Sequence, residues 1–176
     1  MTSSSELVIN ATEQGCRIAL LRDKSLIEFH QEENANQYTV GDIYLGTVKK
    51  VVPGLNAAFI DIGYEKDAFL HYLDLGPQVS SLNKFTKFAI AGKNPSYDLG
   101  RFQNEPDIDK LGKISQVLTK NQKILVQVVK EPISTKGPRL SCELSLAGRY
   151  IVLVPFSNAI SISKKITNNE ERKRLL

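Results

Sequence analysis

The sequence predicts a mainly β protein whose central part folds into a small β-barrel. Residues 43–52 and 55–62 are runs of β-branched and other apolar side chains, and the turn signal Pro53-Gly54 joins them into a hairpin. Further short strand-like runs follow at residues 66–70, 123–131 and 138–144. Together these five strands are enough to form a small barrel.

The first 40 residues are expected to form an incomplete sheet. Runs at 7–11, 16–21 and 25–30 are separated by turn residues and predict an antiparallel meander. Because three short strands leave a sheet face uncovered, this part should belong to a larger domain that is completed elsewhere in the chain. The polar residues 32–37 read as a linker to the barrel.

The second and third barrel strands place aromatic side chains on a solvent-facing side. Since alternate residues of a strand point to opposite faces, the even-numbered residues of 58–62 form an apolar inner face and Phe59 lies on the outer one. Phe69 and His71 share that outer face on the next strand. Exposing such rings sacrifices about 1.5–3 kcal/mol of burial energy each. We therefore expect them to meet a flat ligand, for which single-stranded RNA on an OB-type sheet is the leading candidate. His71 could instead cap the turn that follows it.

Residues 75–119 form a long polar insertion that exceeds a simple turn. Aromatic and basic residues are interleaved at 85–89 and 97–102. They form either a flap that contacts RNA or an insertion whose aromatic rings pin it to the barrel. The near-helical spacing of Ile and Leu within 107–118 predicts a short helix.

The last two barrel strands flank a loop that carries a lysine. In an OB barrel, the loops joining strands one to two and four to five border the binding face. The second of these, residues 132–138, therefore places Lys136 where a phosphate could be held, although a solvated loop lysine is the alternative. In the strand after this loop the residues expected to face inward are Leu140, Cys142 and Leu144, and those expected outward are Arg139, Ser141 and Glu143.

The C-terminal part is predicted to form two strands followed by a helix. Residues 149–156 are apolar enough for a strand buried on both faces, and 160–166 predict another short strand. Asn168 can cap a helix that has Glu171 three residues later. Because the sequence ends within that helix, we expect the natural protein to be longer.

The composition is that of a soluble globular protein. The chain has 176 residues, of which 41% are hydrophobic and 24% charged, and no uninterrupted apolar run could span a bilayer. No secretory signal is visible at the N-terminus. Cys16 and Cys142 lie in no metal-ligand spacing and are expected to be buried free thiols in a reducing cytosol. We therefore expect a cytoplasmic protein without a membrane partner.

The charge is divided along the chain. Residues 1–42 carry a net charge of −4, residues 43–150 of +5 and residues 151–176 of +3. A basic middle and end beside an acidic start favour a polyanionic partner on one region only.

No catalytic constellation can be read from the sequence. Asp61 has no second carboxylate at a metal-binding spacing, which favours a structural role. His30 and His71 are the only histidines and stand in no triad spacing. Lys49-Lys50 and Lys164-Lys165 are expected to be solvated, without an assigned role.

Blocks along most of the chain resemble the ribonuclease E/G family. Gly46-x-Val48-x-x-Val51, Gly54 and Ala57-x-Phe59-x-Asp61 match the pattern of its S1 domain, an OB-fold RNA-binding module. The other matching blocks, in order, are Ile9 to Thr12, Ile43 to Gly46, Ala57 to Gly63, Ala68 to His71, Val126 to Glu131, Thr135 to Gly137 and Ser145 to Pro155. Pro53-Gly54 and Phe69-Leu70-His71 favour the ribonuclease G branch.

The resemblance implies a domain organisation. Residues 1–40 would supply N-terminal strands of a ribonuclease-H-like subdomain, into which the S1 domain, residues 41–145, is inserted. Residues 146–176 would begin an α+β region that senses the 5′ monophosphate of RNA. The insertion at 75–119 departs from the shorter ribonuclease E version, so no contacts carry over to it.

The resemblance also implies site residues and cofactors. Phe59, Phe69 and Lys136 match S1 residues that contact RNA, and Lys130 matches a nearby basic position. Residues matching the lining of the 5′-end pocket are Gly148 and Val152. The aspartates that hold Mg²⁺, a cysteine pair that binds zinc between subunits, and the Arg-Thr pair that grips the phosphate would all lie beyond residue 176. This chain alone is therefore expected to hold no metal and to have no catalytic residue.

Three hypotheses of function remain. The first is the RNA-binding N-terminal portion of a homo-oligomeric endoribonuclease in RNA processing and decay, acting on single-stranded, 5′-monophosphorylated RNA. The others are a stand-alone S1-type RNA-binding module without nuclease activity, and a protein-interaction domain that uses the exposed aromatic rings. RNA binding should weaken with salt by a slope of roughly −0.7 per phosphate contact, whereas a protein partner would show no such slope.

Overall fold

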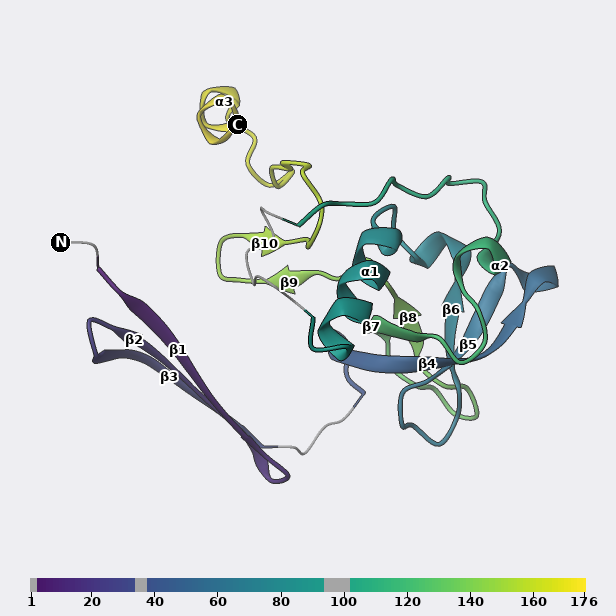
Figure 1. The fold of residues 1–176 in the computed structure, drawn as a ribbon. Coiled ribbons are helices and arrows are strands. Elements are labelled where there is room, and N and C mark those ends of the chain that lie inside the picture. The colour runs from purple at the N-terminus through teal and green to yellow at the C-terminus, as the bar shows by residue number, and fades with distance from the viewer. Residues whose placement is uncertain (1–2, 34–37, 94–101) are drawn as a thin grey trace.

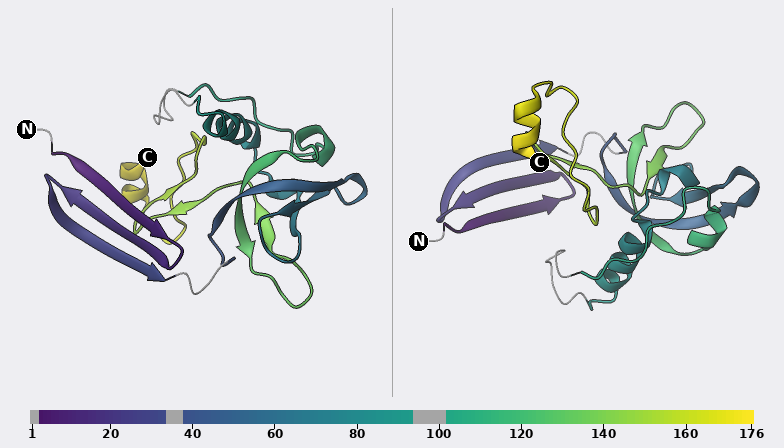
Figure 2. Two further views of the ribbon diagram at one scale, coloured as in Figure 1. Left: turned by 60° about the horizontal axis from the view of Figure 1, so that its bottom comes forward. Right: turned by 90° about the horizontal axis from the view of Figure 1, so that it is seen from above.

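A computed structural model describes residues 3–33, 38–93 and 102–176 (Figure 1). The described strands form three sheets: an N-terminal meander of β1–β3, a closed barrel of β4, β5, β6, β8 and β7, and a hairpin of β9 and β10. In every view the meander stands apart from the barrel (Figure 2). None of the described helices has the length and apolar character that crossing a membrane requires.

The meander confirms the predicted antiparallel order. It consists of β1 (Ser5–Thr12), β2 (Gly15–Arg22) and β3 (Ser25–Glu33), with β2 between the other two. Apolar side chains of β1 and β3 are solvent-exposed, among them Leu7, Ile9 and Phe29. This uncovered surface agrees with the expectation that three short strands do not complete a sheet domain.

The barrel closes in the order β4-β5-β6-β8-β7, with β7 paired back to β4. Its strands are β4 (Ile43–Val52), β5 (Ala57–Asp61), β6 (Ala68–His71), β7 (Lys123–Lys130) and β8 (Arg139–Ser141). All pairs are antiparallel except β6 and β8. A closed five-stranded barrel of this kind is consistent with an OB-fold.

Apolar side chains on the inner faces of the strands fill the barrel core. The fully buried apolar side chains include Val48, Ala58, Ile60, Ala68, Leu70, Ile124, Val126 and Leu140. Cys142 and Leu144 are also buried, as predicted. Ser141 is an exception, because it was expected to face outward but is buried, where its hydroxyl donates to the Asp74 carbonyl at 2.9 Å.

The turn between β4 and β5 is more structured than a Pro-Gly turn. Pro53–Leu55 form a short 3₁₀ helix, η1, and Asn56 follows in the left-handed region with a φ of 47°. The Asn56 side chain accepts from the Ile114 amide at 2.7 Å and donates to the Gly112 carbonyl at 3.1 Å. The turn is thereby tied to the end of the insertion.

The insertion contains a helix that was not predicted. α1 (Val79–Ile90) buries Val79, Leu82 and Thr86. Apolar residues at 79, 82, 85 and 88 recur every three positions, a signal that the surrounding Ser and Asn residues obscured. A second helix, α2 (Ile114–Val117), confirms the short helix expected within 107–118. A further short 3₁₀ helix, η2 (Tyr72–Asp74), links β6 to the insertion.

Aromatic rings attach the insertion to the C-terminal segment. Phe85, Phe102 and Phe156 form a cluster with ring centroids 5.2–5.9 Å apart. These contacts favour the pinning interpretation over an RNA-binding flap, although the partner is the C-terminal segment. Of the predicted aromatic stretch 97–102, only Phe102 lies within the described residues.

Two predictions for the C-terminal part are wrong. Within 149–156 only β10 (Val152–Leu153) is a strand, paired with β9 (Leu146–Ala147), and Tyr150 and Ile151 are 85% and 77% exposed. An apolar run is buried only where another element covers it, and residues 149–153 are exposed, whereas Phe156 packs against Phe85 and Phe102. Residues 160–166 form no strand, and the Ser163 and Ile166 carbonyls accept hydrogen bonds from the Arg172 guanidinium.

The final helix, α3 (Asn169–Leu175), confirms the predicted cap. The Asn168 side chain accepts from the amides of Glu170 and Glu171 at 2.8 and 3.1 Å. Acidic residues in the first turn and basic residues in the last turn complement the helix dipole.

Candidate nucleic-acid interface

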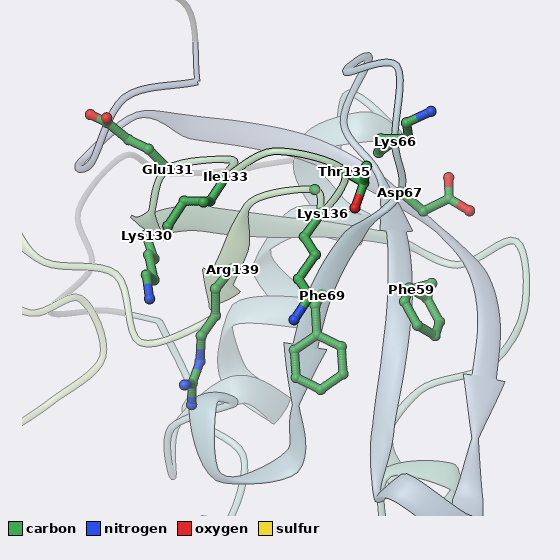
Figure 3. Close-up of a pocket in the computed structure, with 11 residues that line it drawn as sticks. Phe59, Lys66, Asp67, Phe69, Lys130, Glu131, Ile133, Thr135, Lys136 and Arg139 are labelled. Carbon is green, nitrogen blue, oxygen red and sulfur yellow. The ribbon is translucent and has the colours of Figure 1, made fainter.

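Two phenylalanine rings lie side by side on the outer face of the barrel. Phe59 on β5 and Phe69 on β6 are directly opposite in the register, with ring centroids 5.9 Å apart in an edge-to-face arrangement. Both are half-buried, whereas their neighbours Ala58 and Leu70 point into the core. The predicted outward orientation of both rings is confirmed (Figure 3).

The β7–β8 loop carries a lysine whose side chain extends toward these rings. The loop is a tight hairpin, in which the amide of Lys136 donates to the Ile133 carbonyl at 3.0 Å and the reverse bond is 3.2 Å. Gly137 presses against the 66–67 segment so closely that a Cβ there would lie 2.4 Å from the Asp67 carbonyl oxygen. The close approach positions the loop, and the Lys136 side chain extends from it toward Phe69 (Figure 3).

Loop and strands together enclose an open groove of about 750 Å³, here called the aromatic groove. Its lining residues are Phe59, Lys66, Asp67, Phe69, Lys130, Glu131, Ile133, Thr135, Lys136, Gly137 and Arg139. Four of the predicted site residues, Phe59, Phe69, Lys130 and Lys136, therefore meet in one place.

The aromatic groove carries an excess of positive charge. Lys66, Lys130, Lys136 and Arg139 line it against Asp67 and Glu131. The Arg139 guanidinium forms an ion pair with the Asp74 carboxylate. Its Nη2 lies 2.9 Å from a carboxylate oxygen, and its Nε donates a hydrogen bond to the carboxylate at 3.0 Å. Within the described ranges, Lys130 and Lys136 form no ion pair, so their ammonium groups can bind an incoming anion.

Arg139 is a groove residue that the sequence-based site prediction missed. It pairs with Phe69 across the parallel β6–β8 contact and with Lys130 on β7. The alternation of β8 had already placed it outward, between Pro138 and the buried Leu140. What the sequence did not indicate is that β8 lies beside β6, because this pairing joins residues 70 positions apart.

His71 takes the capping role that was one of its two alternatives. Its Nδ1 accepts from the Leu73 amide at 3.1 Å, at the start of η2. Its ring centroid is 6.5 Å from that of Phe69, on the same outer face, but His71 does not line the aromatic groove. Contact with RNA through its remaining nitrogen stays a prediction.

Gly148 and Val152 lie away from the aromatic groove, in the β9–β10 hairpin. The Gly148 amide donates to the Ile151 carbonyl at 2.8 Å, which closes the turn, and Val152 is exposed. Their assignment to a 5′-end pocket stays a prediction.

Asp61 has structural partners on the same outer face. Its carboxylate lies 3.1 Å from the Lys49 ammonium and accepts from the Gly63 amide at 3.0 Å. The Gly63 hydrogen bond, together with Lys49, lowers the pKa of Asp61 below its usual value. Among the residues that the structure describes, no three His, Cys, Asp or Glu side chains lie close enough to hold a metal ion.

Comparison with known proteins identifies the relatives of this chain. The profile of the ribonuclease E/G family matches residues 145–176. The chain is 38% identical to ribonuclease G of Haemophilus influenzae over 170 residues, and 36% identical to ribonuclease G of Escherichia coli over 172 residues. These alignments cover 97% and 98% of this chain. The chain belongs to the ribonuclease E/G family.

The chain spans 31% of the length of these two family members. A ribonuclease E/G-like protein of Porphyra purpurea is 45% identical over 139 residues, which make up 78% of this chain and 22% of that relative. The aromatic groove precedes residues 145–176, the part that the ribonuclease E/G profile matches. The profile match therefore does not include the aromatic groove.

Proposed function

We propose that this chain is the RNA-binding N-terminal portion of an endoribonuclease of the ribonuclease E/G type, and that the aromatic groove binds single-stranded RNA. The observation that carries the proposal is the pair of outward-facing rings of Phe59 and Phe69, bordered by lysines without ion-pair partners in the described ranges. Such a combination of stacking surface and positive charge suits unpaired bases and their phosphates.

The rings would act as platforms for successive bases. Base–aromatic stacking contributes about 1–3 kcal/mol per base and tolerates any sequence, because every base has a π-face. The Lys136 side chain extends toward Phe69 and would hold the phosphate beside a stacked base (Figure 3). Lys130 would bind the next phosphate along the groove. The chain thus orients a single strand without reading its sequence.

The chemical step is proposed to belong to the larger protein. In such an enzyme a bound Mg²⁺ would supply an activated water molecule for hydrolysis of the phosphodiester. The described residues offer no group suited to holding this ion, and their part is to bind and orient RNA. By family resemblance we also propose a cytoplasmic homo-oligomer, a zinc-binding cysteine pair outside this chain, and a 5′-monophosphorylated substrate near Gly148 and Val152.

Binding of a fluorescently labelled, unstructured RNA oligonucleotide, followed by anisotropy, tests the proposal. Phe59→Ala should weaken binding by about 5- to 150-fold, the equivalent of one lost stacking contact. Because the ring is half-buried, the melting temperature should fall only slightly. Phe88→Ala is the matched control, since Phe88 is exposed on α1 and does not line the groove.

The salt dependence separates RNA from a protein partner. The logarithm of the binding constant should fall linearly with the logarithm of salt concentration, with a slope of roughly −0.7 per phosphate contact. Unchanged RNA affinity in Phe59→Ala, combined with a large loss of stability, would place Phe59 in a structural role and contradict the proposal. Cleavage of RNA by the purified chain with Mg²⁺ would contradict the assignment of chemistry to other residues.

A further inference from the structure

The strand register aligns five side chains across the entire barrel. Lys50 pairs with Phe59, Phe59 with Phe69, Phe69 with Arg139, and Arg139 with Lys130. Directly paired residues share one face of a sheet, with Cβ atoms about 4.5–5.5 Å apart in antiparallel pairs. These five residues, here called the cross-strand row, therefore place a cation, two aromatic rings and two further cations in a line across β4, β5, β6, β8 and β7.

Two register shifts place the lysines at the ends of this row. On β4 the pairing moves from Val48–Ile60 to Lys50–Phe59, so Lys49 is an extra residue. On β7 it moves from Val128–Leu140 to Lys130–Arg139, so Val129 is an extra residue. Such bulges re-aim the side chains that follow them.

Without the β4 bulge, Lys50 would point into the core. Val48 is fully buried, so strict alternation would turn Lys49 outward and Lys50 inward. In the structure both lysines are exposed, and Val51 packs against the core instead. The same reasoning applies to Lys130, which is exposed two residues after the buried Val128.

The two lysines of the β4 bulge differ in their partners. The Lys49 ammonium is 3.1 Å from the Asp61 carboxylate, which raises the pKa of Lys49 through a hydrogen bond. Lys50 has no ion pair within the described ranges, and it lies next to Phe59 in the register. Of these two lysines, only Lys50 therefore combines a charge without an ion-pair partner in the described ranges with a position beside a stacking ring.

We propose that single-stranded RNA crosses the barrel along the cross-strand row, and that Lys50 binds a phosphate at its β4 end. The proposal rests on the function proposed above and extends the binding surface beyond the aromatic groove, whose lining does not include Lys50. With neighbouring strands about 4.8 Å apart, the four steps of the row span about 19 Å. RNA would thus run perpendicular to the strands, with cations at both ends of a two-ring platform.

The test compares Lys50→Gln with Lys49→Gln in the 176-residue chain. The probe is a labelled oligouridylate, and its affinity is measured by anisotropy at several salt concentrations. Lys50→Gln should weaken binding several-fold at low salt and reduce the magnitude of the salt slope by about 0.7, the value for one phosphate contact. Lys49→Gln removes the same charge but should leave both quantities nearer those of the unmodified chain, because the Lys49 ammonium is held by Asp61 and does not hold a phosphate.

Phe59→Ala in the same assay distinguishes this inference from the proposed function. If Phe59→Ala weakens binding but Lys50→Gln does not, the path along the row is overturned while RNA binding in the aromatic groove stands. Equal effects of Lys49→Gln and Lys50→Gln would also overturn it, because they would indicate diffuse attraction by surface charge. If neither the unmodified chain nor any variant binds the probe, the proposed function and this inference both fail.

Discussion

Single side chains of this barrel have roles that depend on their nearest partners. Burial raises the pKa of the Cys142 thiol to about 12, so this free cysteine stays protonated and inert at neutral pH, as its expected structural role requires. Cys16, also free, is only half-buried, which departs from the expectation that both thiols are buried. Asp61 and Lys49 form an ion pair on the outer face, and the Lys50 ammonium takes no part in it.

The Asp61–Lys49 pair predicts a pH-dependent stability. The pKa of Asp61 is lowered in the folded chain, so its contribution is present above the ordinary carboxyl value of 3.8 and is lost as the pH falls through the lowered value. Asp61→Asn should therefore lower the melting temperature slightly at pH 7 and not at all in strong acid. Because both groups are substantially exposed, solvent screens the pair and the effect should be small.

Thermal melts of both chains between pH 2 and pH 7 would measure this difference. Glu65→Gln is a suitable control, since Glu65 is exposed and forms no ion pair within the described ranges. A gap between the unmodified chain and Asp61→Asn that widens toward acid pH would contradict the prediction.

At the scale of elements, the β7–β8 loop positions Lys136 in the aromatic groove beside the two rings. Its two backbone hydrogen bonds define the hairpin, but its place over the sheet depends on contact between Gly137 and the 66–67 segment. The loop between β5 and β6 thus supports the β7–β8 loop, which carries Lys136.

Gly137→Ala should separate the two loops. The added Cβ would meet backbone atoms of Asp67 and Lys66 at 2.4–3.1 Å, and backbone cannot yield as a flexible side chain can. We expect a loss of about 1–3 kcal/mol in the free energy of unfolding and several-fold weaker RNA binding, because Lys136 moves away from Phe69. Urea unfolding and anisotropy measure the two effects.

Gly54→Ala is the matched control for this experiment. A Cβ at Gly54 meets no atom within 4 Å, so stability and RNA binding should both stay unchanged. Equal behaviour of the two variants would show that the contact at Gly137 does not position the loop.

At the scale of the whole molecule, one buried amide holds the two ends of the barrel together. Gln127 donates through Nε2 to the Gly41 carbonyl at 2.9 Å and to the Ser145 carbonyl at 3.0 Å. Its Oε1 accepts from the Ser145 amide at 2.9 Å. The chain therefore enters and leaves the barrel at neighbouring points. This geometry suits a domain that is inserted at residues 41–145. These boundaries stay a prediction.

Gln127→Glu should destabilise the barrel more at neutral than at acid pH. An ionised carboxylate cannot donate, so the Gly41 and Ser145 carbonyls would lose their donor and face a negative charge, at a cost of about 1–3 kcal/mol. Protonation restores one donor and reduces the cost. Urea unfolding at pH 7 and pH 5 would measure this, with the exposed Gln103→Glu as the control. An equal loss at both pH values would contradict the role assigned to the amide.

The β pattern and the outward position of the rings could be predicted from local sequence. Alternation at 58–62 and 140–144 placed the core side chains correctly, and Phe59 and Phe69 followed from the same rule. Asn168 was likewise recognised as a cap, because the residues that it bonds are only two and three positions away.

The sequence by itself determined that Ala58, Ile60 and Ile62 face inward and that the rings of Phe59 and Phe69 remain outside, because these assignments depend on a period of two within one strand. Only the tertiary structure decided that Arg139 joins the groove, that a bulge turns Lys50 outward, and that the apolar residues 150–153 stay exposed. The physical reason is that strand register and surface coverage arise from contacts between segments far apart in the chain, which no local pattern encodes.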